Sequence, residues 1–136
     1  MGALRILGSA LVLGCSVELT QPACASEPGP VIAPLMLKEL ADLPGKEMVM
    51  ITVNYPPGAV EQIHRHHGHA FVYVLEGTII EGVRGGKEVT LRPGDTFYEG
   101  LNDVHTVGRN ASTTKPAKFI VVLLKDKGVD AVLPAE

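Results

Sequence analysis

The 136-residue sequence has only two cysteines, Cys15 and Cys24, and both lie near its start. A chain without that first segment has no cysteine at all, so no disulfide framework stabilises it. Its stability must then come from one hydrophobic core, which a chain of about 110 residues is long enough to build.

The sequence also lacks a basic cluster and, beyond its start, any long apolar run. Its 12 lysine and arginine residues are outnumbered by 15 acidic residues, which gives a formal net charge of −3. Nucleic-acid-binding proteins concentrate lysine and arginine on one surface, so we expect no nucleic-acid partner. No later apolar run reaches the roughly 20 residues that span a bilayer, so we expect no membrane span.

Residues 1–25 differ in composition from the rest and read as a secretory signal peptide. Arg5 precedes an apolar run too short to cross a bilayer, and Ala23-Cys24-Ala25 has the Ala-x-Ala form of a cleavage site. We therefore expect cleavage after Ala25 and a secreted or periplasmic location. The alternative is a lipoprotein that is processed before Cys15 and lipidated there.

Short apolar runs separated by glycine and proline fill the chain from Lys46 onward. The clearest runs are residues 47–53, 71–75 and 118–124, and the last is the most continuously apolar. Such spacing is typical of an antiparallel sandwich or barrel rather than of alternating strands and helices. The pattern predicts an all-β fold.

The runs also indicate how the chain is divided. We expect one β domain at residues 46–126, an N-terminal arm at 26–45 and a C-terminal tail at 127–136. The start of the arm is rich in proline, which favours irregular structure. Its second half, residues 35–43, fits either a short helix or an edge strand.

Four of the five histidines lie between His64 and His69, and the fifth, His105, stands alone downstream. His64 and His66 are two residues apart, so on a strand both rings project from one face. A third nitrogen from another strand, such as that of His105, completes a facial set that leaves coordination positions open. The spacing predicts a metal site between two segments of a β-rich fold.

The two histidine segments resemble the two motifs of the cupin family. In the first, Gly58 is followed after five residues by His64-Arg65-His66, and Gly77 closes the segment. In the second, Pro93-Gly94-Asp95 is followed by His105, ten positions after the aspartate. The order and spacing of these residues together carry the resemblance.

The resemblance covers about residues 46–125 and implies a cupin jelly-roll barrel of short antiparallel strands. It further implies that His64, His66 and His105 bind a divalent transition metal, namely iron, manganese, copper or nickel. Small cupins often dimerise through an N-terminal strand that joins a neighbour's sheet. The resemblance therefore implies a homodimer, with residues 31–43 covering an exposed sheet edge.

One departure from the family motif concerns a carboxylate. Cupins commonly place a glutamate four residues after the second histidine, and here that position is Ala70. Glu99 is a candidate replacement, because on a strand that begins at Asp95 it shares a face with Phe97. It then points into the barrel near His105 as a metal ligand and catalytic group. If the strand ends earlier, Glu99 faces water instead.

Four further side chains could belong to this site. His67 and His69 have the opposite parity to the ligand pair, but a bulge at Gly68 could turn His69 inward as an extra ligand. Tyr73 and Phe97 are candidates for lining a substrate pocket, although aromatic residues in a barrel more often serve packing.

We expect a metalloenzyme of the dioxygenase or oxidase type that acts on a small oxygenated or aromatic molecule. Three neutral imidazoles leave the charge of the metal uncancelled, which favours anionic substrates. The alternative is a cupin that binds a small ligand or a metal without turnover. It is supported by Ala70, which removes the usual carboxylate.

Overall fold

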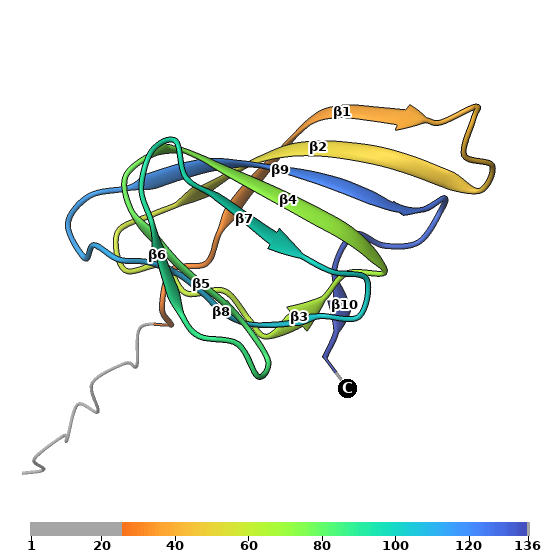
Figure 1. Ribbon diagram of the computed structural model, residues 1–136. Coiled ribbons are helices and arrows are strands. Elements are labelled where there is room, and N and C mark those ends of the chain that lie inside the picture. The colour runs from red at the N-terminus through yellow and green to blue at the C-terminus, as the bar shows by residue number, and fades with distance from the viewer. Residues whose placement is uncertain (1–25, 136) are drawn as a thin grey trace, which may run out of the picture.

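The computed structural model describes residues 26–135, which form two antiparallel five-stranded sheets. The first sheet contains, in spatial order, β1 (Val31–Glu39), β2 (Lys46–Tyr55), β9 (Ala117–Asp126), β4 (Gly68–Glu76) and β7 (Thr96–Glu99). The second contains β10 (Leu133–Pro134), β3 (His64–Arg65), β8 (Val104–Asn110), β5 (Ile79–Val83) and β6 (Val89–Leu91). Figure 1 shows the two sheets facing each other. The predicted all-β jelly-roll fold is confirmed.

The core lies between the sheets because apolar and less buried residues alternate along the central strands. In β9, Phe119, Val121 and Leu123 are buried, while the residues between them face the other side. Tyr55 at the end of β2 is fully buried and meets Phe119 edge to face, with ring centroids 4.9 Å apart. This period of two follows from strand geometry, in which successive side chains point to opposite faces.

The N-terminal arm is partly a strand. β1 pairs with β2 along the edge of the first sheet, so the strand alternative for residues 35–43 is observed in part. β1 begins at Val31, within the proline-rich stretch that we expected to be irregular. Pro34 is tolerated because β1 is an edge strand, where a missing N–H does not break the sheet. The register shifts between Pro34 and Met36.

The signal peptide predicted at residues 1–25 lies outside the described residues. Within residues 26–135, the structure has no helix long and apolar enough to cross a membrane.

Gly68 allows β4 to lie unusually close to β9. A Cβ atom at Gly68 would meet the Leu124 carbonyl oxygen and would lie 2.8 Å from Lys125 Cα. Both are backbone atoms that cannot rotate away. We therefore expect Gly68→Ala to lower the free energy of unfolding by about 1–3 kcal/mol, measured by urea denaturation. Gly29→Ala, where no atom lies within 4 Å, is the control. Equal midpoints for the two variants would contradict this packing.

Candidate metal site

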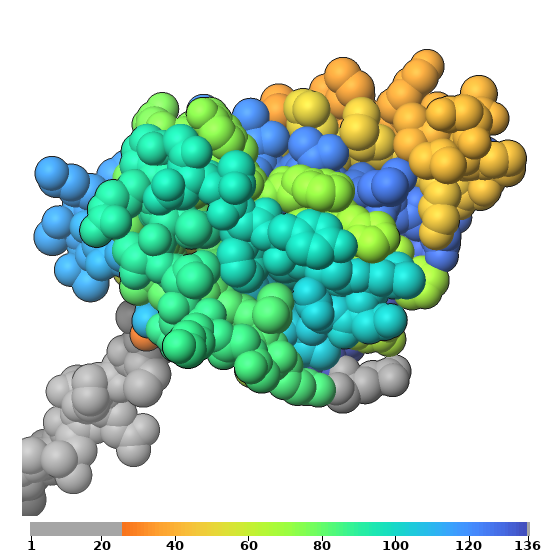
Figure 2. Space-filling model, in the orientation of Figure 1, coloured from red at the N-terminus to blue at the C-terminus, as the bar shows by residue number. Residues whose placement is uncertain are grey.

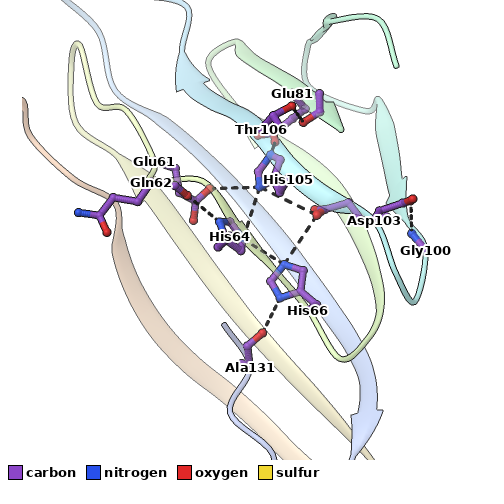
Figure 3. A network of polar contacts seen from close by, with 12 residues as sticks. Glu61, Gln62, His64, His66, Glu81, Gly100, Asp103, His105, Thr106 and Ala131 are labelled. Carbon is purple, nitrogen blue, oxygen red and sulfur yellow. Dashed lines mark hydrogen bonds and ion pairs between the residues drawn. The ribbon is translucent and has the colours of Figure 1, made fainter. Parts of the chain in front are cut away.

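Three histidine rings converge in the space between the sheets. His64 lies on β3 and pairs with His105 on β8, so the two rings project from the same face. His66 follows β3 directly, and all three side chains are buried. The Nε2 atoms of His64 and His66 are 3.2 Å apart, and His105 Nδ1 is 3.4 Å from His64 Nε2. Figure 3 shows the three rings turned toward one another.

Backbone carbonyl groups fix the protonation of two of these rings. His64 Nδ1 lies 2.8 Å from the oxygen of Gln62, and His66 Nδ1 lies 2.5 Å from that of Ala131 (Figure 3). A carbonyl oxygen only accepts, so each Nδ1 carries a hydrogen, and in the neutral form of each ring the lone pair is on Nε2. Burial also lowers the pKa of His66, which favours its neutral ring.

The third ring is oriented by a buried carboxylate that the sequence analysis did not identify. His105 Nε2 donates to Glu81 Oε2 on β5 at 2.5 Å, which leaves Nδ1 turned toward His64. Burial lowers the pKa of His105, but the bond to Glu81 and nearby carboxylates outweigh it and raise this pKa to about 9. A metal that binds at Nδ1 therefore displaces a proton.

The geometry of these nitrogens fits a divalent transition metal. The Nε2 atoms of His64 and His66 face each other at 3.2 Å, and a shared cation would stabilise this contact between two neutral rings. Nitrogens that are each about 2.1 Å from one ion lie roughly 2.9–3.4 Å apart at octahedral to tetrahedral angles. The two observed separations, 3.2 and 3.4 Å, fall in this range.

Glu99 lies at the same cluster. β7 extends as far as Glu99, whose side chain is buried, so the inward alternative is the one observed. Glu99 Oε2 is 3.8 Å from His66 Nε2 and 4.0 Å from His105 Nδ1, and it has no hydrogen-bond partner. Burial raises the pKa of Glu99 to about 7, although the charge of His105 acts in the opposite direction.

Glu99 lies next to the position where the family motif has a glutamate. Glu99 on β7 is the paired neighbour of Ala70 on β4. Paired residues on antiparallel strands point to the same face. The structure therefore places a carboxylate from the adjacent strand beside the histidines.

A second carboxylate at the cluster comes from a loop. The ligand atoms of Glu61, His64 and His105 all lie within 4.8 Å of one another. Tyr55 donates a hydrogen bond of 2.6 Å to Glu61 Oε2, and burial raises the pKa of Tyr55, so this proton is retained. Sequence reasoning missed Glu61 because strand parity does not apply to a loop. The available signal was its position three residues before His64.

Gly108 on β8 keeps space open beside the cluster. A Cβ atom there would lie 2.8 Å from Glu61 Oε2 and 2.9 Å from both His105 Cε1 and the Tyr55 hydroxyl. We expect Gly108→Ala to displace these groups and to weaken metal binding on the order of tenfold or more, measured by calorimetric titration. Gly82→Ala, whose Cβ would meet Val107 at an ordinary 3.4 Å, is the control. Unchanged affinity in Gly108→Ala would contradict this tight fit.

The other candidate residues lie away from the cluster. β4 has no bulge near Gly68, so His69 stays on the outer face, where its Nδ1 is 2.7 Å from the Tyr98 hydroxyl. Tyr73 also faces outward and is 47% exposed. Phe97 points inward but packs against the core. The structure thus brings neither His69 nor Tyr73 to the cluster, because strand parity persists through β4.

A small cavity of about 120 Å³ adjoins the cluster. One wall is formed by the three histidines together with Glu61, Glu81 and Glu99. The rest of the lining is largely apolar and includes Ile51, Val53, Val72, Phe119, Val121 and Leu123. No lysine or arginine of the described chain lines this cavity. The expectation of anionic substrates rested on the imidazoles alone, and it did not take account of the buried Glu81 and Glu99 and the half-buried Glu61.

The chain was compared with protein families, curated proteins and solved structures. A search of curated proteins gave no match. An uncharacterised double-stranded β-helix protein from Klebsiella pneumoniae is similar in structure, with a TM-score of 0.62 and 20% identity over 82% of this chain and 90% of that one. A cupin domain from Bordetella pertussis has a TM-score of 0.58 and 20% identity over 74% and 98%.

A DMSP lyase from Ruegeria pomeroyi also shares the fold. Its TM-score is 0.56 at 22% identity, over 63% of this chain and 42% of the lyase. Residues 51–123 match the cupin domain family, and this segment contains all three clustered histidines. The chain therefore belongs to the cupin family.

Proposed function

We propose that this cupin is a metal-dependent enzyme that acts on a small oxygenated or aromatic molecule, with dioxygenase- or oxidase-type chemistry. In this proposal His64, His66, His105 and Glu99 hold iron, manganese, copper or nickel. The supporting observation is that hydrogen bonds fix the three rings so that one nitrogen of each faces a common point beside a buried carboxylate. Such a metal polarises a bound oxygen or activates dioxygen.

The residues of the chain supply the other requirements of such a site. Burial raises the pKa of Glu99 to about 7, and a bound cation beside it would favour the charged form that a metal ligand requires. Tyr55 holds the Glu61 carboxylate in place. The apolar wall of the cavity excludes water from the ligand.

Oxygen uptake by iron(II)-loaded protein, in the presence of small phenols and hydroxyacids, tests this proposal. We expect uptake and an oxidised product from at least one compound, and loss of both in His66→Ala. Metal-loaded protein that binds such compounds but forms no product would favour the alternative, a non-catalytic small-ligand or metal-binding cupin.

Proton-transfer chemistry of the lyase or isomerase type is a second candidate. It is supported by the Glu61 carboxylate, a candidate proton acceptor at the cluster that the Tyr55 hydroxyl holds in place through a hydrogen bond of 2.6 Å. The similar structure of a DMSP lyase is consistent with it. Incorporation of solvent deuterium into a substrate without oxygen uptake would support this reaction over oxidation.

We also propose that the protein is a homodimer that associates through β1. All nine residues of this strand are exposed, including Val31 at 57% and Leu37 at 66%. Figure 2 shows the segment at the rim of the molecule. Unpaired edge strands readily join a strand from another chain. Light scattering should give twice the monomer mass and a monomer for Leu37→Asp; a monomeric wild type would contradict the proposal.

Finally, we propose export of the chain by its first 25 residues. The Ala-x-Ala sequence ending at Ala25 supports this proposal. Intact-mass measurement of protein from the periplasm should give a chain that begins at Ser26. A lipidated chain beginning at Cys15 would support the lipoprotein alternative instead.

A further inference from the structure

A groove of about 960 Å³ at the surface adjoins the small cavity beside the histidine cluster. The groove and the cavity share four lining residues, namely Ile32, Glu61, His64 and Val132. Two of these, Glu61 and His64, also belong to the cluster. A molecule whose head group occupies the cavity can therefore extend into the groove.

Apolar side chains from separate segments of the chain gather in this groove, although each is exposed to solvent. They come from β1, from the loop before β3 and from the C-terminal tail, and include Ile32, Val60, Ile63 and Val132. Apart from Glu27 and Gln62, the residues that line the groove but not the cavity are apolar or glycine. Exposed apolar side chains that cluster in this way mark a binding surface.

The C-terminal tail forms one side of the groove and is held in place along its length. Lys125 Nζ donates to the Val129 carbonyl oxygen at 2.5 Å, and the Ala131 carbonyl oxygen accepts from His66. Further along, β10 pairs with β3. This side of the groove is therefore formed before a ligand binds, which lowers the cost of ordering it on binding.

We propose that the groove binds the apolar tail of an elongated substrate whose small oxygen-bearing head group lies at the metal cluster. The cavity, at about 120 Å³, lies below the roughly 300–1,000 Å³ of pockets that hold drug-sized molecules, whereas the groove lies within that range. This inference rests on the proposed function, because the head group must bind the metal. It adds the substrate class, an amphiphilic molecule with one polar end, and requires no particular charge on that end.

Two straight-chain probes with the same metal-binding head group test the inference: acetohydroxamate and octanohydroxamate. Because the head groups are identical, their charge and their bonds to the metal cancel in the comparison. Binding to cobalt(II)-loaded protein is measured by calorimetry. We expect octanohydroxamate to bind at least about tenfold more tightly, since each fully covered methylene group contributes up to about fourfold. Equal affinities would overturn the inference.

Ile63→Asn shows whether the groove binds the chain of the probe. Ile63 lines the groove but not the cavity and is 56% exposed, so the fold should tolerate a polar side chain there. The advantage of octanohydroxamate should fall at least about threefold. Tyr73→Asn, at an exposed position on the outer face of β4, is the control and should keep the full advantage. Equal advantages in the two variants, or a loss in Tyr73→Asn alone, would overturn the role of the groove.

Metal content, measured by elemental mass spectrometry on the same samples, separates the failure of this inference from the failure of the proposed function. Wild-type protein that retains cobalt and binds both hydroxamates equally refutes the apolar-tail class and leaves the metal site intact. Wild-type protein that retains no cobalt refutes the metal site, and this inference with it.

Discussion

Replacing His66 by alanine should weaken binding of cobalt(II) by more than about 100-fold, which exceeds the loss typical of an outer-sphere partner. The variant loses one of three nitrogens, the one 3.2 Å from His64 Nε2. It also leaves the carbonyl oxygen of Ala131 without its donor. Calorimetric titration of metal-free protein measures the affinity.

His69→Ala is the matched control for this experiment. It makes the same chemical change three residues further along, but on the outer face beside Tyr98. We expect its affinity to equal that of the wild type within about threefold, because it contributes no ligand. If both variants lose affinity equally, the metal binds to the histidine-rich segment as a whole and not to the buried cluster.

Glu81→Gln should lower the affinity for cobalt(II) by roughly 10- to 100-fold without removing any ligand nitrogen. Glu81 accepts from His105 Nε2 at 2.5 Å and so turns Nδ1 toward the other rings. A neutral amide accepts this hydrogen bond more weakly and can turn its NH2 group toward the ring. Calorimetric titration measures the affinity, and the melting temperature of the metal-free protein shows whether the fold is retained.

The exposed Glu76→Gln provides the comparison for Glu81→Gln, since it makes the same change outside the cavity. Glu76→Gln should bind cobalt(II) as tightly as the wild type. If Glu81→Gln binds it equally tightly, His105 is held by its strand alone and Glu81 has no positioning role.

The fold and the histidine cluster were predictable because both follow from strand parity. Alternation in β9 and β4 indicates which side chains meet between the sheets. The spacing of His64 and His66 places two rings on one face, and the pairing of His64 with His105 on β8 brings the third alongside. The inward position of Glu99 follows from the same rule once the strand reaches it.

The remaining features depend on contacts between distant segments. Glu81 lies on β5, far in sequence from either histidine segment, and reaches the site only because β5 pairs with β8. The carbonyl of Ala131, which orients His66, belongs to the C-terminal tail. The sequence does not distinguish a strand from a helix at residues 35–43. An exposed edge strand such as β1 has no buried face, so its apolar and polar residues do not alternate.

The paired residues Ala70 and Glu99 show that a motif should be examined across neighbouring strands as well as along the chain. Along the sequence, the family's carboxylate is missing. Across the sheet, the paired position on β7 brings a carboxylate to the histidines, with Glu99 Oε2 3.8 Å from His66 Nε2.

Anomalous diffraction from crystals grown with cobalt(II) tests the central claim most directly. The account predicts one strong peak per chain, at bonding distance from the Nε2 atoms of His64 and His66 and from Nδ1 of His105. A peak instead beside His67, whose Nδ1 lies 2.8 Å from Asp126 Oδ2 at the surface, or no peak between the three buried rings, would contradict it.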